Sequence, residues 1–201
     1  MKITDIQRQV RAAGRYSVFV DGNFVFGLSE TGLLESGMKL GQIIDQVELK
    51  KLKKLSDTDK LYNQTIGLIA RRPRSRKEIN DYLARKTDDQ QEITQLLNKL
   101  SNLQLIDDED FAQRWVENRR LLKATSQRKL TLELKQKGIS DETIKQVLSE
   151  DETNEQDVLR RLIIKKRTQS RYKDDQKLIA YLARQGFGYE DIKTVMQNIK
   201  N

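Results

Sequence analysis

The helical part of this chain contains three copies of one sequence pattern, and this internal repeat limits the possible folds more than any other feature of the sequence. Tyr82-Leu83-Ala84-Arg85-Lys86 returns as Tyr181-Leu182-Ala183-Arg184-Gln185, and a third copy lies around Leu134. A fixed period of this size is typical of stacked helical units, which usually present a long surface to a partner. Apolar positions correspond at spacings of 51 and then 48 residues: Ile79, Leu130 and Leu178; Leu83, Leu134 and Leu182; Ile93, Ile144 and Ile192; Leu97, Leu148 and Met196.

Each repeat is predicted to contain three helices, A, B and C. Helix A covers 60–72, 108–122 and 156–169, helix B covers 75–86, 126–137 and 173–185, and helix C covers 89–101, 141–149 and 189–199. Ser75-x-x-Glu78 is a capping box at the start of the first helix B, and Gly138 and Gly186 favour the ends of the later two. Pro73, the only proline, separates the first helices A and B. The repeats are therefore expected at 59–106, 107–153 and 154–201, after a helical linker at 46–58.

Residues 1–45 are predicted to be rich in β-structure. Asp21-Gly22 favours a two-residue hairpin turn, and a weaker strand containing Ile6 precedes this hairpin. With this turn, Phe19 faces Phe24, Phe26 lies on the same side, and Val18 and Val25 lie on the other. Two roles of the hairpin stay open, a small folded cap and a partner-binding element, and the cap is favoured because exposed apolar patches are uncommon in monomers. The expected fold is mainly α, with tandem three-helix repeats in an elongated curved array and a small N-terminal β-hairpin or β-meander domain.

Composition excludes several kinds of chemistry. The chain has no cysteine and no histidine, which we take to exclude disulfides, zinc sites, cysteine nucleophiles and Ser-His-Asp triads. Its carboxylates cluster at predicted helix starts, where they compensate the helix dipole, and no phosphate-binding loop or metal-carboxylate motif occurs. We therefore expect no catalytic residue, no metal, no cofactor and no enzymatic activity. The sequence also lacks an apolar run long enough to span a membrane, so we expect a cytoplasmic protein without a membrane partner.

Positive charge is concentrated at one place in every repeat. Lysine and arginine total 38 against 30 acidic residues, a net charge of +8, which favours an anionic partner. Stacked repeats would align the A-to-B junctions as a cationic stripe. These cations either complement helix C-termini or bind phosphates or an acidic protein groove; for the clusters together, binding is favoured. The candidate binding residues are Arg71, Arg72, Arg74, Arg76 and Lys77; Arg119, Arg120, Lys123, Arg128 and Lys129; and Arg160, Arg161, Lys165, Lys166, Arg167, Arg171 and Lys173.

Trp115 is the only tryptophan in the chain. It could stack on a nucleic-acid base, but it shares a helical face with Phe111 and Leu122, a pattern more often found in a hydrophobic core. The same argument predicts a shared core face in the third repeat, formed by Leu159, Leu162 and either Ile163 or Lys166 one turn on. We therefore expect Trp115 to have a role in the core.

Several separate segments resemble the RecX family of regulatory proteins. Leu61-Tyr62, Ile69-Ala70-Arg71-Arg72-Pro73-Arg74-Ser75-Arg76-Lys77-Glu78 and Tyr82-Leu83-Ala84-Arg85-Lys86 resemble the first repeat of that family. The most specific similarity is the segment from Leu103 to Glu117, which contains Ile106-Asp107-Asp108-Glu109-Asp110-Phe111, and 130–139 resembles the helix B that follows it. The resemblance covers roughly 58–200, and the hairpin around Asp21-Gly22 resembles the N-terminal extension of some members. Repeat one departs from the pattern, because Lys86-Thr87 lacks the glycine found at Gly138 and Gly186.

This resemblance implies a function that composition cannot give. It implies a protein that lies in the groove of the RecA–DNA filament across neighbouring subunits and hinders ATP turnover, strand exchange and filament growth, in recombination, DNA repair and the SOS response. The implied partners are the RecA filament and single- or double-stranded DNA, contacted directly or through the filament, and the chain is expected to be a monomer. The alternative is a stand-alone DNA-binding helical module. A nuclease is less favoured, because clustered acidic metal ligands are missing.

Overall fold

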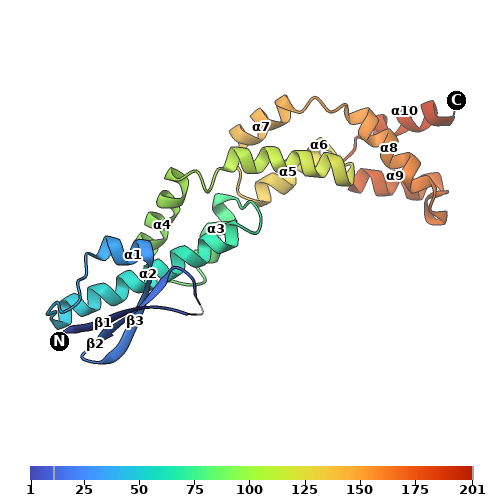
Figure 1. Cartoon of the computed structure of the whole chain (residues 1–201). Helices are drawn as coiled ribbons and strands as arrows, with labels where there is room; N and C mark the ends of the chain where they lie inside the picture. The colour runs from blue at the N-terminus through green and yellow to red at the C-terminus, as the bar shows by residue number, and fades with distance from the viewer. Residues whose placement is uncertain (11, 201) are drawn as a thin grey trace. The chain divides into compact units, whose positions relative to one another are not determined.

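The computed structural model describes residues 1–10 and 12–200, apart from the side chain of Lys200 (Figure 1). Arg11 and Asn201, which the predicted N-terminal domain and third repeat include, lie outside the described residues. The chain forms two compact units. The first contains Met1–Pro73 and Ile79–Asn102, and the second contains Arg74–Glu78 and Leu103–Asn201.

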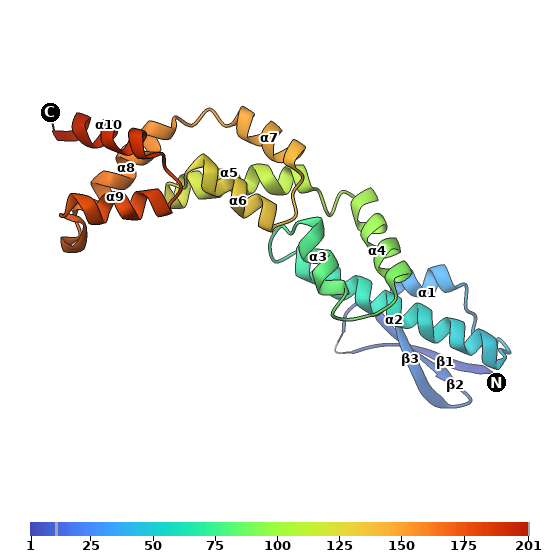
Figure 2. The same ribbon diagram turned by 180° about the vertical axis from the view of Figure 1, so that it is seen from behind.

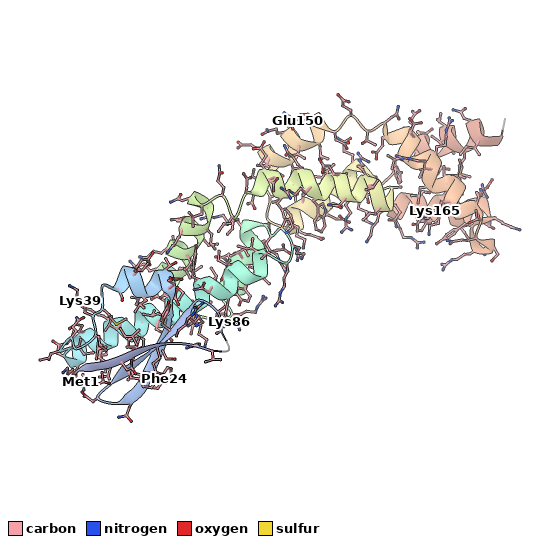
Figure 3. The ribbon with its side chains drawn as sticks, in the orientation of Figure 1. Met1, Phe24, Lys39, Lys86, Glu150 and Lys165 are labelled. Atoms are coloured by element: carbon pink, nitrogen blue, oxygen red, sulfur yellow. The ribbon has the colours of Figure 1, made fainter. Side chains whose placement is uncertain are left out.

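The first unit begins with a three-stranded antiparallel sheet of β1 (Ile3–Arg8), β2 (Arg15–Val20) and β3 (Asn23–Ser29). Phe19 pairs with Phe24, but Val18 pairs with Phe26, which leaves Val25 as an extra residue on β3. Such a bulge switches the side chains that follow it to the other face. Phe26 is consequently buried with Val18, whereas Phe24 is 58% exposed near the hairpin turn (Figure 3). The prediction that Phe26 lies on the side of Phe19 and Phe24 was therefore wrong.

Two helices, α1 (Glu30–Ser36) and α2 (Gln46–Ile69), follow the sheet, and α2 packs on β3 (Figure 1). The predicted linker and first helix A are one continuous helix of 24 residues, so the expected break between them was wrong. Asp59 lies in the middle of α2. Its carboxylate accepts hydrogen bonds from the backbone N–H of Ser29, at 2.8 Å, and from the side chain of Asn63, at 3.0 Å. The polar residues around Asp59 thus serve tertiary contacts and do not end the helix.

The first unit is completed by most of α3 (Arg76–Leu83) and by α4 (Gln90–Asn102). Ile79 and Leu83 on α3 are fully buried, and Ile93 and Leu97 on α4 are nearly so. Helix α3 ends three residues before the predicted position, because the backbone N–H groups of Lys86 and Thr87 both bond to the carbonyl of Leu83 and form a turn.

The second unit contains two three-helix groups, each with its own hydrophobic core (Figure 2). The first group consists of α5 (Asp108–Lys123), α6 (Gln127–Gln136) and α7 (Asp141–Glu150). The second group consists of α8 (Glu155–Arg167), α9 (Asp175–Arg184) and α10 (Tyr189–Lys200), with the short 3-10 helix η1 (Ser170–Tyr172) before α9. Tandem three-helix repeats following an N-terminal antiparallel sheet confirm the predicted fold class.

Corresponding positions of the three repeats are buried alike. Leu130, Leu134, Leu178 and Leu182 are fully buried, and the predicted core positions on α7 and α10 are at most 9% exposed. Trp115 is partly buried and stacks on Phe111, with ring centroids 5.7 Å apart, as expected for a packing role. In contrast, the prediction that Leu122 shares this core was wrong. The core face of α5 does not extend to its last turn, where Leu122 is 68% exposed.

Candidate partner-binding cleft

The guanidinium of Arg120 holds the turn between α5 and α6 in place. It donates hydrogen bonds to the carbonyl of Thr125 at 2.6 Å, to Asp151 at 2.8 Å and to Glu155 at 3.0 Å. Its side chain is only 9% exposed. Arg167 likewise holds the segment after α8 in place, because its guanidinium donates a hydrogen bond to the carbonyl of Lys173 at 2.6 Å. Internal bonds thus occupy both guanidiniums.

The carboxylate of Asp151 remains charged beside Arg120. Burial pushes the pKa of Asp151 upward, but hydrogen bonds from Thr153 and Arg120 outweigh this effect, so the pKa lies below its ordinary value. The ion pair between Asp151 and Arg120 is therefore complete at neutral pH. Reversing the charge of Arg120 would leave the carboxylate of Asp151 facing a like charge, so we expect this change to destabilise the fold.

Two buried serines join successive repeats by the same pair of hydrogen bonds. Ser126 caps α6 by accepting from the backbone N–H of Lys129 at 3.2 Å, and its hydroxyl donates to the carbonyl of Gln185, at the end of α9, at 2.6 Å. Ser75 likewise accepts from the backbone of Glu78 at 3.2 Å and donates to the carbonyl of Lys137 at 2.7 Å. We call the Ser75–Lys137 contact the first joint and the Ser126–Gln185 contact the second joint.

The glycine that follows each joint explains the departure seen in repeat one. Gly186 has a φ of +94°, and a Cβ atom there would lie 2.6 Å from the hydroxyl oxygen of Ser126. Gly138 has a φ of +78°, and a Cβ atom there would lie equally close to the side chain of Lys77. Both positions therefore require glycine for close approach as well as for backbone conformation. Thr87 occupies the equivalent position of the first repeat, before which no other three-helix repeat has to fit.

At the first joint, carboxylates neutralise the cations. Glu133 accepts from Arg119 at 2.6 Å and from the indole N–H of Trp115 at 2.9 Å. Glu78 pairs with Lys137 at 2.8 Å. The guanidinium of Arg119 also lies over the indole ring, 4.4 Å from its centroid. These contacts hold Arg119 and Lys137 against neighbouring side chains of the same unit.

At the second joint, cations surround a cleft of about 510 Å³. One wall comes from the end of α5, the following turn and α6, and the other comes from α8 and α9. Glu133 is the only carboxylate in the lining, and Arg119 and Trp115 already occupy it. Lys165 of α8 is exposed and is labelled in Figure 3. The basic residues in the lining are Arg120, Lys123, Lys129, Arg161, Lys165 and Lys166.

The structure thus brings together six of the seventeen candidate binding residues, drawn from the second and third predicted clusters. Four others of these two clusters are exposed outside this cleft: Arg128, Arg160, Arg171 and Lys173. Arg119 and Arg167 have internal ion-pair partners. The first predicted cluster is divided between the units, with exposed Arg71 and Arg72 in the first and Arg74, Arg76 and Lys77 in the second.

Sequence reasoning missed the uncharged part of the cleft. Leu121 and Leu122 line it and are 83% and 68% exposed, and Tyr181 contributes from α9. The ammonium of Lys166 lies 4.8 Å from the centre of the Tyr181 ring. The repeat alignment did identify Tyr181, but the close approach of α9 to the end of α5 is a tertiary contact that periodicity does not contain.

The described part of the chain contains neither a metal-binding group nor a membrane-spanning helix. No group of three or more acidic side chains that could hold a metal ion occurs there. No helix within residues 1–10 and 12–200 combines the length and the apolar character needed to cross a bilayer.

Comparison with known protein families gives matches along the chain. A family described as the regulatory protein RecX N-terminal domain matches residues 1–45. Families described as the first, second and third three-helix domains of RecX match 62–100, 107–148 and 153–196.

Individual relatives match over nearly the whole chain. Regulatory protein RecX of Clostridium botulinum (strain Alaska E43 / Type E3) is 31% identical over 207 residues, covering 100% of this chain and 97% of that protein. RecX of Bacillus subtilis (strain 168) is 27% identical, covering 98% and 77%. Among solved structures, a crystal structure of regulatory protein RecX has a TM-score of 0.76 at 23% identity and covers 98% of each chain, and RecX from Lactobacillus salivarius has a TM-score of 0.61 at 26% identity, covering 72% and 97%.

Proposed function

The chain belongs to the RecX family of regulatory proteins, and we propose on this basis that it binds the RecA–DNA filament and restrains it. The observation that carries the proposal is the match of four consecutive RecX domains along one chain, in the order that the repeats require. The family is one of regulators rather than enzymes. The proposed activity is inhibition of RecA ATP turnover, strand exchange and filament extension.

The proposed mechanism is multivalent clamping along the filament groove. A protein built from repeated modules can contact several identical filament subunits at once, so modest contacts add up to tight binding on a filament and weak binding to free RecA. A clamp across neighbouring subunits opposes the motions that ATP turnover requires. Exposed cations such as Lys123 and Lys165 suit an acidic or phosphate-bearing surface.

A charge-reversal experiment tests this mechanism. Lys123→Glu combined with Lys165→Glu changes two exposed cleft residues that make no ion pair with any described residue. Lys145→Glu with Lys193→Glu is the matched control, because these residues are exposed on α7 and α10 outside the cleft. The cleft variant should require a higher concentration to inhibit RecA ATPase on single-stranded DNA, and the control should inhibit like the unchanged protein. Equal inhibition by both variants would refute a role of the cleft in clamping.

We also propose that the chain acts as a monomer. The device that joins repeats is incomplete at both ends of the series, since Asp174 replaces the capping serine in the third repeat and Thr87 replaces the glycine in the first. A carboxylate cannot donate the joining hydrogen bond. Sedimentation equilibrium should therefore give the mass of one chain at micromolar concentration, and a concentration-dependent series of higher masses would contradict this proposal.

The alternative function is a stand-alone DNA-binding module, which the cationic cleft favours. Its mark would be tight binding to bare DNA that weakens steeply with salt, because each neutralised phosphate releases counterions. Such binding with no effect on RecA would replace the filament proposal.

A further inference from the structure

We propose that the cleft at the second joint is a binding site for consecutive phosphate groups, and that a bound ligand locks the joint. This inference goes beyond the proposed regulation of RecA, because it assigns a ligand chemistry to one cleft and couples binding there to the joint between two repeats. It rests on a comparison that the chain itself provides, since the first joint has the same backbone device with different side chains around it.

The two joints can be aligned position by position, by the repeat spacing in helix B and by the N-caps and buried positions in helix A. From helix B of each repeat, Glu78 corresponds to Lys129, Glu133 to Tyr181 and Lys137 to Gln185. In helix A, the N-caps Asp107 and Asn154 correspond, as do buried Phe111 and Val158. The first joint therefore has Glu78, Arg114, Asn118, Arg119, Glu133 and Lys137 where the second has Lys129, Arg161, Lys165, Lys166, Tyr181 and Gln185.

The two sets differ in the balance of charge. The first joint combines three cations with two carboxylates, and these carboxylates pair with Arg119 and Lys137. At the equivalent positions, the second joint has four cations and no carboxylate. Glu133, which also lines this cleft, already accepts from Arg119 and Trp115. The first joint forms although most of its cations are paired with carboxylates. The fold therefore does not require the excess of positive charge found at the second joint. The excess is better explained by a ligand that supplies the negative charge.

Neighbouring protein groups do not neutralise this charge. Arg161 and Lys165 are exposed and form no ion pair with any residue that the structure describes. Lys129 donates to the neutral amide oxygen of Gln185 at 2.6 Å. Like charges that share a cleft repel one another, so a ligand with several adjacent negative charges would gain from each of them. Consecutive phosphates provide such charges, and their oxygens accept strong hydrogen bonds from lysine and arginine.

The position of the cations connects binding to the joint. Lys123 and Lys129 belong to one wall, and Arg161 and Lys165 belong to the other. The Ser126–Gln185 hydrogen bond lies between these walls. A phosphate chain that contacts cations on both walls therefore stabilises the joint in its present arrangement. Two sources share this chemistry, namely the backbone of a nucleic acid and a free oligophosphate.

The test restores the chemistry of the first joint at the second. Lys129→Glu with Lys165→Asn introduces residues that occupy the equivalent positions of the first joint, so the variant is expected to fold. Lys129→Glu also places a glutamate three residues after the capping Ser126, in the same sequence pattern as Ser75 and Glu78, and should raise the melting temperature slightly. The matched control, Lys145→Glu with Lys193→Asn, makes the same changes on exposed residues outside the cleft.

The probes are inorganic tripolyphosphate, followed by calorimetry, and a fluorescent abasic oligonucleotide, followed by anisotropy, each with the protein alone at low salt. We expect the cleft variant to lose affinity by about tenfold or more, since charge-assisted contacts are removed and a carboxylate is added. The control should change by less than about twofold. Bound ligand should also slow amide hydrogen exchange at 124–129 and 185–187 in the unchanged protein.

Each outcome has a defined meaning. Binding of the abasic oligonucleotide alone identifies a nucleic-acid backbone, binding of tripolyphosphate alone identifies a small oligophosphate, and binding of both identifies phosphate chains in general. The proposal is overturned if neither probe binds, if the cleft variant binds like the unchanged protein, or if the control loses as much. RecA ATPase measured on the same samples separates the two proposals, because normal inhibition without phosphate binding removes only this inference.

Discussion

Replacing Ser126 with alanine should measure the strength of the second joint. The hydroxyl of Ser126 is fully buried, accepts from the backbone N–H of Lys129 and donates to the carbonyl of Gln185. Loss of an N-cap costs about 1 kcal/mol. Loss of the donor to the partly buried carbonyl of Gln185 costs about 1 kcal/mol more. The Ser126→Ala variant should therefore lower the free energy of unfolding of the second unit by about 2 kcal/mol.

Ser140→Ala provides the matched comparison. Ser140 caps α7 by accepting from the backbone N–H of Thr143 at 3.1 Å, but it is exposed and joins no second repeat. Its replacement should cost only about 1 kcal/mol. Urea unfolding followed by the fluorescence of Trp115, which lies in the same unit, measures both values. Equal losses in the two variants would refute the claim that the serine hydroxyl joins successive repeats.

Three further predictions concern two glycines, the Arg120–Asp151 ion pair and the acid dependence of stability. Gly186→Ala should destabilise the protein by about 2 kcal/mol or more in thermal denaturation, because Gly186 has a φ of +94° and a Cβ atom there would contact Ser126. Gly67→Ala is the comparison: Gly67 lies in open space within α2, so this change should stabilise the protein by about 0.5–1 kcal/mol. A more stable Gly186→Ala variant than Gly67→Ala variant would contradict this reasoning. Arg120→Met should cost about 3 kcal/mol in urea unfolding, since it leaves the carboxylate of Asp151 without its partner, and a loss below about 1 kcal/mol would show that the pair is unimportant. The pKa of Asp151 is lowered in the folded state, so its contribution to stability is present at neutral pH and is lost as the pH falls below about 4. Asp151→Asn should remove this part of the acid dependence of the free energy of unfolding. If the variant keeps the same dependence of stability on pH, the lowered pKa of Asp151 does not contribute to it.

The sequence predicted the repeats well because burial in a helix leaves a period in the sequence. Ile79, Leu130 and Leu178 share a position, and all three are fully buried. The apolar period did not predict the ends of the first helix A, which was expected at 60–72 but is part of the helix Gln46–Ile69. Nothing in the apolar pattern distinguishes a linker followed by a helix from the continuous helix Gln46–Ile69, since the polar stretch around Asp59 is explained by contacts with Ser29 that only the fold creates.

Local irregularities could not be read from the pattern either. The bulge at Val25 moves Phe26 to the buried face of the sheet, and a strict alternation of sides cannot contain that shift. The sequence alone does not explain why Thr87 stands where the later repeats have glycine. The explanation comes from the structure, in which Gly186 lies against Ser126 and Gly138 lies against Lys77. The first repeat has no three-helix repeat before it to contact at this position, so it does not need the glycine.

The candidate site was predicted by composition but not by geometry. Clustered cations were visible in the sequence, and six of them meet in one cleft. Sequence alone gave no means of separating Arg120, whose partners Asp151 and Glu155 lie 31 and 35 residues away, from exposed Lys123 three positions later. Distinguishing a structural cation from a binding cation requires the tertiary partners of each.

The central claim, regulation of RecA, is tested most directly by the ATPase activity of RecA on single-stranded DNA while this protein is titrated from far below to above one molecule per RecA subunit. The account predicts suppression well below a one-to-one ratio, because a clamp on the filament restrains an assembly of many subunits. Undiminished ATPase at ratios above one-to-one, with the protein shown to be folded, would contradict it.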